Sequence, residues 1–202
     1  MSNWKALLIG LCVTAGSAAA AFGQAQAAPR VDAPRADVPN SLAAYAQSVL
    51  VKMVQEPAVV QYLDAQNARP VRLEDLKALD QRWAASAGVE AYMWDLMRNR
   101  LAWTLADFQY RHKFITEVFA MDRRGAIVAE TNRTSTFYKG EAEKFTAAFA
   151  GGDGAIWFGP AAYDDSTAEM EIQVSVPVLK AGKAEGVVCF GVSLDRWEER
   201  KE

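Results

Sequence analysis

Polar and aromatic residues gather between Thr131 and Phe145, where they could form the wall of a ligand pocket. Thr131, Arg133, Phe137 and Tyr138 follow a predicted strand, at a position where a loop can stretch across the face of a sheet. An arginine there can hold a carboxylate by paired N–H donors, and a tyrosine supplies an aromatic wall and a hydroxyl group. The alternative is that Arg133 is solvated and that Tyr138 only packs under the loop.

A second group of such residues lies on the connection after a later predicted strand: Trp157, Tyr163, Asp164, Asp165 and Ser166. Adjacent acids can receive an ammonium group, and an aromatic ring can close over such a cation. The other interpretation is an ordinary turn, because Asp and Ser also bond their own backbone. Combined with the arginine of the first group, the pattern suits a zwitterion such as an amino acid. A ligand with only a carboxylate or only an amine stays open.

Other kinds of chemistry have weaker support in the sequence. Asp153, Asp164, Asp165 and Glu169 lack the alternating carboxylates and the glycine of a calcium loop, so no metal site is predicted. His112, the one histidine, has no Ser or Cys partner at a suggestive spacing and is interpreted as structural. Paired acids alone are poor evidence for acid–base catalysis. We therefore expect neither an enzyme nor a cofactor.

The first 27 residues are typical of a secretory signal peptide. Lys5 precedes an apolar run to about Phe22, and Ala25-Gln26-Ala27 forms an A-x-A cleavage site. A retained membrane anchor is the alternative, but small and polar residues interrupt the run before the roughly 20 strongly apolar residues that a span needs. We therefore expect a periplasmic chain with no membrane span after cleavage.

Charge and cysteine content exclude two further classes. The net charge of −3 becomes about −4 when Lys5 is removed, and no basic block remains, so a nucleic acid partner is not predicted. Cys12 lies inside the signal, which leaves Cys189 without a partner for an internal disulfide. Within its apolar strand, Cys189 is expected to be a buried small hydrophobe. About 165 residues after the leader suffice for one domain with its own core.

The elements that must position these residues begin with helices. Residues 28–39 are rich in Pro, Ala, Arg and Asp without periodicity and predict a flexible leader. Residues 40–113 predict a helical layer, which begins at Asn40 and is interrupted at Pro57, a residue suited to a first helical turn. A helix over Leu73 to Ala85 should turn four apolar residues inward: Leu73, Leu76, Leu79 and Trp83. A further helix is predicted from about Val89 to Tyr110.

Residues 114–194 change to a period of two, which predicts strands. Phe114 to Met121 and Ala126 to Thr131 should form a hairpin, followed by a short helix over Glu141 to Ala150. Three more strands are predicted at Ala155 to Phe158, Glu169 to Val178 and Glu185 to Leu194. The fold class is therefore α+β, an antiparallel sheet of about five strands packed against the helical layer. Residues 195–202 are expected to be a charged tail.

Several stretches together resemble the extracellular PAS-like sensor domains called Cache or PDC domains. These stretches are FAMDRRGAIVAETNRTSTFYKGEAEKF, GPAAYDDSTAEMEIQVSVPVLKAGKAEGVVCFGVSL, EPAVVQYLDAQNAR and LKALDQRWAAS, and the resemblance covers about Ser41 to Leu194. It implies a long N-terminal helix on a sheet of five or six antiparallel strands. It also implies a small-molecule pocket between the sheet and the segment that joins its second and third strands, here Asn132 to Ala155.

The resemblance also implies a function, since relatives usually form the sensor part of chemoreceptors and sensor kinases. This sequence departs from them after Asp195, where RWEERKE contains no apolar span, so a separate membrane partner is expected to transmit the signal. The leading hypothesis is a periplasmic domain that binds a small polar ligand: an amino acid, an organic acid or an amine. The alternative is a structural or interaction module of the cell envelope that binds no ligand. A hydrolytic enzyme ranks third.

Overall fold

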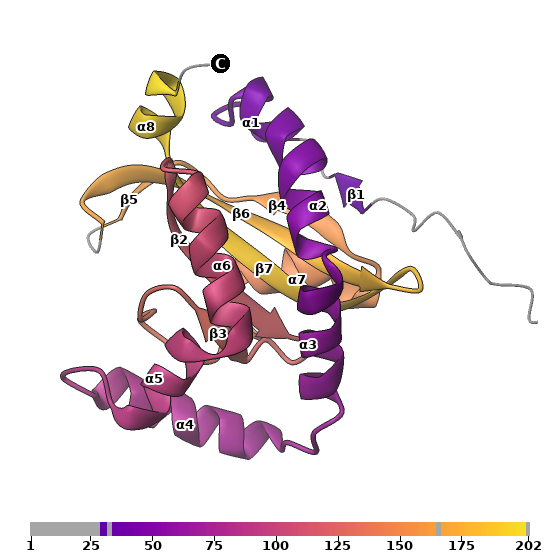
Figure 1. The fold of residues 1–202 in the computed structure, drawn as a ribbon, viewed down its shortest axis with the longest axis vertical. Helices are drawn as coiled ribbons and strands as arrows, with labels where there is room; N and C mark the ends of the chain where they lie inside the picture. The colour runs from indigo at the N-terminus through magenta and orange to yellow at the C-terminus, as the bar shows by residue number, and fades with distance from the viewer. Residues whose placement is uncertain (1–28, 32–33, 165–166, 201–202) are drawn as a thin grey trace, which may run out of the picture.

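A seven-stranded sheet runs through the middle of the molecule and carries helices on both faces (Figure 1). The computed structural model describes residues 29–31, 34–164 and 167–200, so the expected signal peptide lies outside the described residues. The strands are β1 (Arg30–Val31), β2 (Ile115–Asp122), β3 (Ile127–Glu130), β4 (Ala155–Phe158), β5 (Ala162–Asp164), β6 (Glu169–Lys180) and β7 (Lys183–Ser193). The expected α+β class is confirmed.

The strands follow the order β1-β4-β6-β7-β2-β3, and β5 pairs with β6. All pairings are antiparallel except the one between β1 and β4, which is parallel. The expected count of five strands is therefore too low by β1 and β5. Their lengths of two and three residues are too short for a period of two to be recognised.

The described helices are α1 (Asn40–Tyr45), a π-helical segment (Ala46–Leu50), α2 (Val51–Val54), α3 (Pro57–Asn67), α4 (Leu73–Ala85), α5 (Ala91–Arg98), α6 (Arg100–Arg111), α7 (Glu143–Phe149), a 3-10 turn (Ala150–Gly152) and α8 (Leu194–Glu199). Pro57 occupies the first turn of α3, as predicted. Among the described helices, none has the length and apolar content to cross a membrane.

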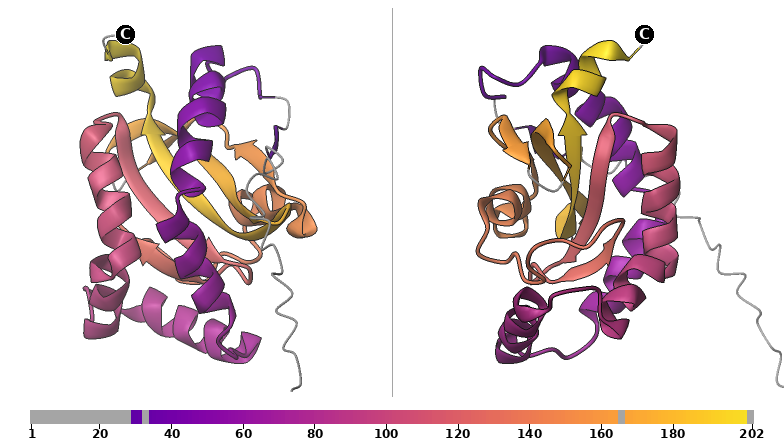
Figure 2. Two further views of the ribbon diagram at one scale, coloured as in Figure 1. Left: turned by 45° about the vertical axis from the view of Figure 1, so that its right-hand side comes forward. Right: turned by 90° about the vertical axis from the view of Figure 1, so that its left-hand side faces the viewer.

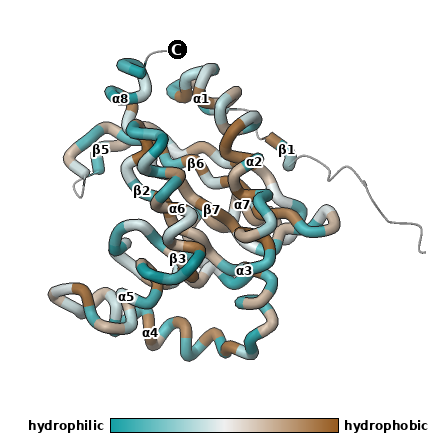
Figure 3. The backbone as a smooth tube through the Cα atoms, viewed as in Figure 1, coloured by the Kyte–Doolittle hydropathy of each residue, from teal (hydrophilic) through white to brown (hydrophobic). Residues whose placement is uncertain are grey.

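Two hydrophobic cores lie on the two faces of the sheet. Figure 2 shows helices on both sides of the sheet in its edge-on view. In one core, the helical segments from α1 to α3 pack together with α6 and α8 against one face of the sheet. This face carries side chains such as Val118, Val174 and Phe190. The other core joins α4, α5 and α7 to the opposite face, which carries Phe119 and Cys189. In Figure 3 the hydrophobic colours gather on the central strands β6 and β7, which are buried on both sides. Cys189 is fully buried, as expected.

The predicted helical layer is not one continuous layer, because the helix expected from Val89 to Tyr110 is divided at Asn99. This residue has an extended backbone (φ −76°, ψ 170°), and its Oδ1 accepts a hydrogen bond from Ala102 N at 2.9 Å. Its Nδ2 donates to Val128 O at 2.8 Å, which ties the break to β3. Asn99 therefore ends α5 and caps α6. The expected inward position of Leu73 is also wrong, since it opens α4 and is 50% exposed.

The two ends of the described chain differ from their expectations as well. The leader contributes β1 and the buried side chain of Val38. The expected charged tail contains α8, in which Trp197 is buried. Its ring makes edge contacts with Tyr45 and Phe114, and its Nε1 donates to Ser41 Oγ at 3.2 Å. One aromatic residue among charged ones is too weak a pattern to predict this helix.

Candidate functional site

The floor of the site is a row of residues across three neighbouring strands. Glu117 on β2 lies opposite Gly191 on β7, and Gly191 lies opposite Gln173 on β6. Gln173 Nε2 donates a hydrogen bond to Glu117 Oε1 at 3.1 Å. The register of β2 against β7 shifts between Ile115 and Glu117, and such bulges often redirect side chains beside functional sites. A hydrogen-bonded polar pair thus spans β2, β7 and β6 at this level of the sheet.

Gly191 keeps this floor open. A Cβ atom at Gly191 would lie 2.7 Å from Thr116 Oγ1, 2.8 Å from Glu117 Cγ and 2.9 Å from Glu171 Oε2. Real Cβ atoms are almost never found below 3.0 Å from such neighbours. The close approach of these three side chains therefore requires glycine at this position.

Residues 131–139, called the covering loop below, pass over the floor and are fastened to α4. Trp83 Nε1 donates to Thr134 O at 2.7 Å, and Asp80 Oδ1 accepts from the backbone N–H groups of Phe137 and Tyr138 at 2.7 and 2.9 Å. Hydrogen bonds from two N–H groups to one carboxylate are stronger than neutral ones. The helix therefore fixes the loop above the sheet.

Arg133 strengthens the same attachment. Its Nη2 donates to the carbonyl oxygens of Trp83 and Ser86, each at 2.9 Å, at the C-terminal end of α4. Its Nε is buried without a hydrogen-bond partner among the described residues. A buried N–H without a partner is costly, so this attachment of Arg133 leaves one donor unsatisfied. Arg133 is neither simply solvated nor free to move.

Between the floor and the covering loop lies a cavity of about 400 Å³, called the first cavity below. This volume is within the roughly 300–1,000 Å³ range of small-molecule sites. Its walls carry both signs of charge together with hydroxyl, amide and aromatic groups. They are formed by Glu117, Phe119, Arg133, Thr134, Ser135, Lys139, Lys144, Tyr163, Asp164 and Gln173.

Two lysines supply positive charge beside the covering loop. Lys139 Nζ donates to Thr136 Oγ1 at 2.5 Å and lies 6.0 Å from the centre of the Phe119 ring. Lys144 comes from α7, and its Nζ lies 5.7 Å from the same ring. Burial lowers the pKa of Lys139, and the positive charge of Lys144 lowers it further. A bound carboxylate would relieve this repulsion.

Carboxylates supply the opposite charge. Burial raises the pKa of Glu117; Lys144 opposes this rise, whereas the carboxylates of Glu171 and Asp164 add to it. Glu130 lies behind the covering loop, where its Oε2 accepts from Thr134 N at 3.1 Å and from Thr134 Oγ1 at 3.0 Å. Burial raises the pKa of Glu130 to about 7, against the lowering effect of these two hydrogen bonds.

A second cavity of about 220 Å³ adjoins the first. It is lined by Trp157, Gly159, Pro160, Ala162, Tyr163, Asp164, Glu171 and Gln173. Tyr163, Asp164 and Gln173 line both cavities. The two spaces therefore lie on either side of one short wall.

The structure brings four of the predicted site residues to these cavities. Arg133 lines the first, Trp157 lines the second, and Tyr163 and Asp164 line both. Asp165 and Ser166 lie outside the described residues.

The other three predicted residues have structural contacts. Thr131 Oγ1 accepts from Val118 N at 3.0 Å, so it fixes the end of the hairpin. Phe137 is buried in the second core, and Tyr138 packs against that core beside a bridge to Ala126. None of the three lines either cavity in the described part of the chain. The interpretation of Tyr138 as packing under the loop therefore agrees with the structure better than ligand contact does.

Sequence reasoning missed several residues of the walls. Glu117 is the one charged residue within the alternating run from Ile115 to Met121, and a charge in a buried strand is a signal that could have found it. On β6, the polar side chain of Gln173 lies between the apolar residues Ile172 and Val174, which is a similar signal. Lys139 and Lys144 carry no such signal, because lysines beside a helix start are common on surfaces.

Comparisons with known proteins give matches at the level of structure. No family model and no curated sequence matches the chain. Among solved structures, the sensor domain of the Vibrio cholerae histidine kinase DctB matches with a TM-score of 0.45 and 14% identity. The match covers 79% of this chain and 51% of the DctB chain.

Two chemoreceptor domains match less well. The ligand-binding domain of Campylobacter jejuni Tlp3 in complex with L-valine has a TM-score of 0.40 at 14% identity, with 80% of this chain and 66% of that chain covered. The ligand-binding domain of Pseudomonas aeruginosa PctC in complex with GABA has a TM-score of 0.36 at 15% identity, with 68% and 56% covered. The matched structures are sensor domains of a histidine kinase and of chemoreceptors, the class of protein that the sequence resembles. The case for the function of this chain rests on its own cavities.

Proposed function

We propose that the chain binds a small polar ligand in the first cavity, without chemical turnover, as a sensor domain. The observation that carries the proposal is the charge of the cavity wall. Arg133, Lys139 and Lys144 contribute positive charge, and Glu117 and Asp164 contribute negative charge. A ligand with a carboxylate and an ammonium group would pair with both sets, so an amino acid fits better than an organic acid or an amine.

Isothermal titration of the folded chain against amino acids, organic acids and amines tests this proposal. We expect saturable binding at one site, strongest for amino acids, with the ligand recovered unchanged. Glu117→Gln should weaken binding because it removes a charge but keeps a group of the same shape. Glu199→Gln, on α8 away from the cavity, is the matched control. Absence of binding across the whole panel would contradict the proposal, and so would turnover of the ligand.

The proposal includes a periplasmic location and a separate membrane partner, such as a sensor kinase or a chemoreceptor. The sequence supports the location through its signal-like first 27 residues. Fractionation of cells that produce the chain tests the location, and crosslinking with and without ligand tests the partner. Retention of the chain in the cytoplasm would contradict this part of the proposal.

An interaction module is the second candidate, and the outer face of α6 favours it. Trp103 on this helix is 66% exposed, and Tyr110 is exposed about two turns further along the same side. The indole Nε1 of Trp103 donates to Arg98 O at 3.0 Å, so its exposed surface is mainly apolar. Aromatic residues are enriched in the centres of protein interfaces. Loss of a copurifying envelope protein in Trp103→Ala, with the cavity empty of ligand, would favour this candidate.

A further inference from the structure

The second cavity extends the space available to a ligand in the first. Tyr163, Asp164 and Gln173 line both cavities, and Gln173 also forms part of the floor through its hydrogen bond to Glu117. A ligand whose carboxylate and ammonium groups pair in the first cavity can therefore pass a side chain over this wall into the second.

The charges divide unequally between the two cavities. All the lysines and the arginine of the site line the first cavity, whereas no basic residue lines the second in the described part of the chain. Asp164 and Glu171 give the second cavity two carboxylates. A cationic group would compensate this excess of negative charge.

Among the described residues, no ion pair to Glu171 is found. Glu171 is 3% exposed, and its Oε1 accepts a hydrogen bond from Thr167 Oγ1 at 2.5 Å, while its Oε2 has no partner of hydrogen-bonding geometry. The neighbouring base Arg196 pairs instead with Glu169. Burial raises the pKa of Glu171; the hydroxyl groups of Thr167 and Thr116 oppose this rise, whereas the carboxylates of Asp164 and Glu169 add to it. Buried carboxylates of this kind are costly unless a cation joins them.

Two aromatic rings complete the walls. A Cβ atom at Gly159 would lie 3.0 Å from Trp157 Cη2 and 3.2 Å from Cζ3, so the glycine leaves room for the indole. Gly159 N donates to Gln173 O at 2.8 Å, which holds this glycine beside the shared wall. Tyr163 is 59% exposed and therefore available to contact a ligand. Aromatic faces beside carboxylates suit an organic cation, since they attract its charge and pack against its methylene groups.

We infer that the second cavity receives a cationic side chain of the ligand, so that the chain prefers amino acids that end in a guanidinium or ammonium group. This inference rests on the proposed function, because the first cavity must hold the carboxylate and the α-ammonium group. It adds a site for a third charge on the ligand, formed by Asp164 and Glu171 between Trp157 and Tyr163.

Matched ligands test the inference directly. Isothermal titration of the full chain at pH 8 should show that L-arginine binds at least about tenfold more tightly than L-citrulline, which has a similar shape and no side-chain charge. L-lysine should bind more tightly than L-norleucine by a similar factor. Equal affinities within each pair would overturn the inference and leave the proposed function standing. Absence of binding for all four, and for the wider panel of acids and amines, would overturn the proposed function as well.

Matched variants locate the preference. Glu171→Gln should reduce the arginine-to-citrulline ratio by about tenfold, because the amide keeps the shape and loses the charge. Glu199→Gln, on the exposed side of α8, should leave the ratio unchanged, because Glu199 lines neither cavity. If Glu171→Gln fails to fold, Asp164→Asn provides the second test, since Asp164 is the other carboxylate that lines the cavity and its amide keeps the shape without the charge. An unchanged ratio in the folded variants would overturn the assignment to this cavity.

Discussion

Gly191 is the residue that permits the close packing of side chains at the floor of the site. Its missing side chain lets Thr116, Glu117 and Glu171 approach one another above β7. Glycine inside a strand weakens the strand, so its presence here is best explained by this close approach. The residue lies in the middle of a run, GVVCFGVS, whose other members give a clear strand pattern.

We expect Gly191→Ala to weaken binding of the amino acid by about tenfold or more, because overpacking of a dense site costs about 1–3 kcal/mol. Isothermal titration measures the change. Gly88→Ala is the control, since a Cβ atom at Gly88 meets no atom within 4 Å. Unchanged affinity in the Gly191 variant would show that the ligand does not use this floor.

Glu130 should make stability depend on pH. Burial raises its pKa to about 7 from the ordinary 4.5, so between these values the folded chain holds a proton that the unfolded chain has lost. Its contribution to stability is therefore complete below about pH 4.5 and is lost as the pH rises through about 7. The shift corresponds to roughly 3 kcal/mol.

The measurement is the free energy of unfolding by urea between pH 4.5 and 7.5 for the unaltered chain and for Glu130→Gln. The unaltered chain should lose stability relative to the variant as the pH rises, because the amide does not titrate. Two curves that stay parallel over this range would contradict the role assigned to Glu130.

At the scale of elements, α4 acts as the support of the covering loop. Asp80 accepts hydrogen bonds from the backbone N–H groups of Phe137 and Tyr138. Trp83 donates one to the carbonyl oxygen of Thr134. We expect Asp80→Ala to open the loop, since each hydrogen bond to a charged group contributes a net stabilisation of roughly 1.5–3 kcal/mol.

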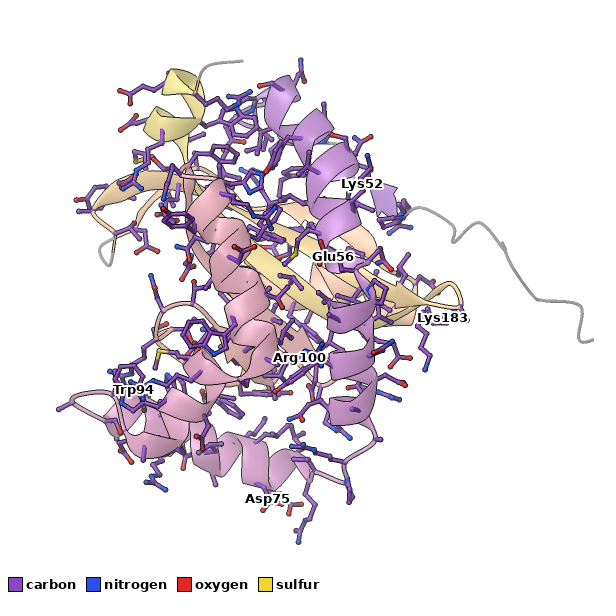
Figure 4. All side chains as sticks on the ribbon, in the orientation of Figure 1. Lys52, Glu56, Asp75, Trp94, Arg100 and Lys183 are labelled. Carbon is purple, nitrogen blue, oxygen red and sulfur yellow. The ribbon has the colours of Figure 1, made fainter. Side chains whose placement is uncertain are left out.

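Hydrogen exchange of the amides in the covering loop measures this opening. Protection of Phe137 and Tyr138 should fall by at least about tenfold in Asp80→Ala. Asp75→Ala is the control, because Asp75 lies on the outer side of the same helix, where Figure 4 labels it. Equal protection in both variants would show that the loop is held by its packing alone.

Most elements could be predicted from the sequence, because their patterns are long. β2, β6 and β7 have at least eight residues each, and Pro57 and the glycines around 151–154 mark where helices begin and end. The elements that were missed are short, as for β1 and β5, or depend on a distant contact. Asn99 is one such case, since its bond to Val128 O joins parts of the chain that no local pattern connects.

The site could be predicted only in outline for the same reason. Arg133, Trp157, Tyr163 and Asp164 were found because their residue types suit a ligand. Lys144 and Gln173 line the cavity because α7 and β6 pack beside it, and sequence alone does not show this packing. Phe137 was assigned to the ligand because sequence cannot show on which side of the covering loop an aromatic ring packs.

At the scale of the molecule, helices at both ends of the described chain meet beside the sheet. Trp197 of α8 contacts Tyr45 from the first helical segment and Phe114 next to β2. We expect Trp197→Ala to lower the free energy of unfolding by about 3–5 kcal/mol, as for other buried aromatic residues. Urea denaturation measures this loss.

The control for this variant is Trp103→Ala, which removes the same side chain from an exposed position. It should change stability by less than about 0.5 kcal/mol. A small effect of Trp197→Ala, similar to that of the control, would contradict the view that α8 is part of the fold.

The proposed ligand site lies between the sheet and the covering loop. The most direct measurement is the change in amide NMR signals of the folded chain during titration with L-arginine and, in parallel, with its uncharged analogue L-citrulline and other amino acids. We expect saturable shifts for at least one amino acid, concentrated at Gly191, Gln173 and Thr134. Shifts that concentrate on the outer face of α6, or no saturable shift with any amino acid, would contradict it.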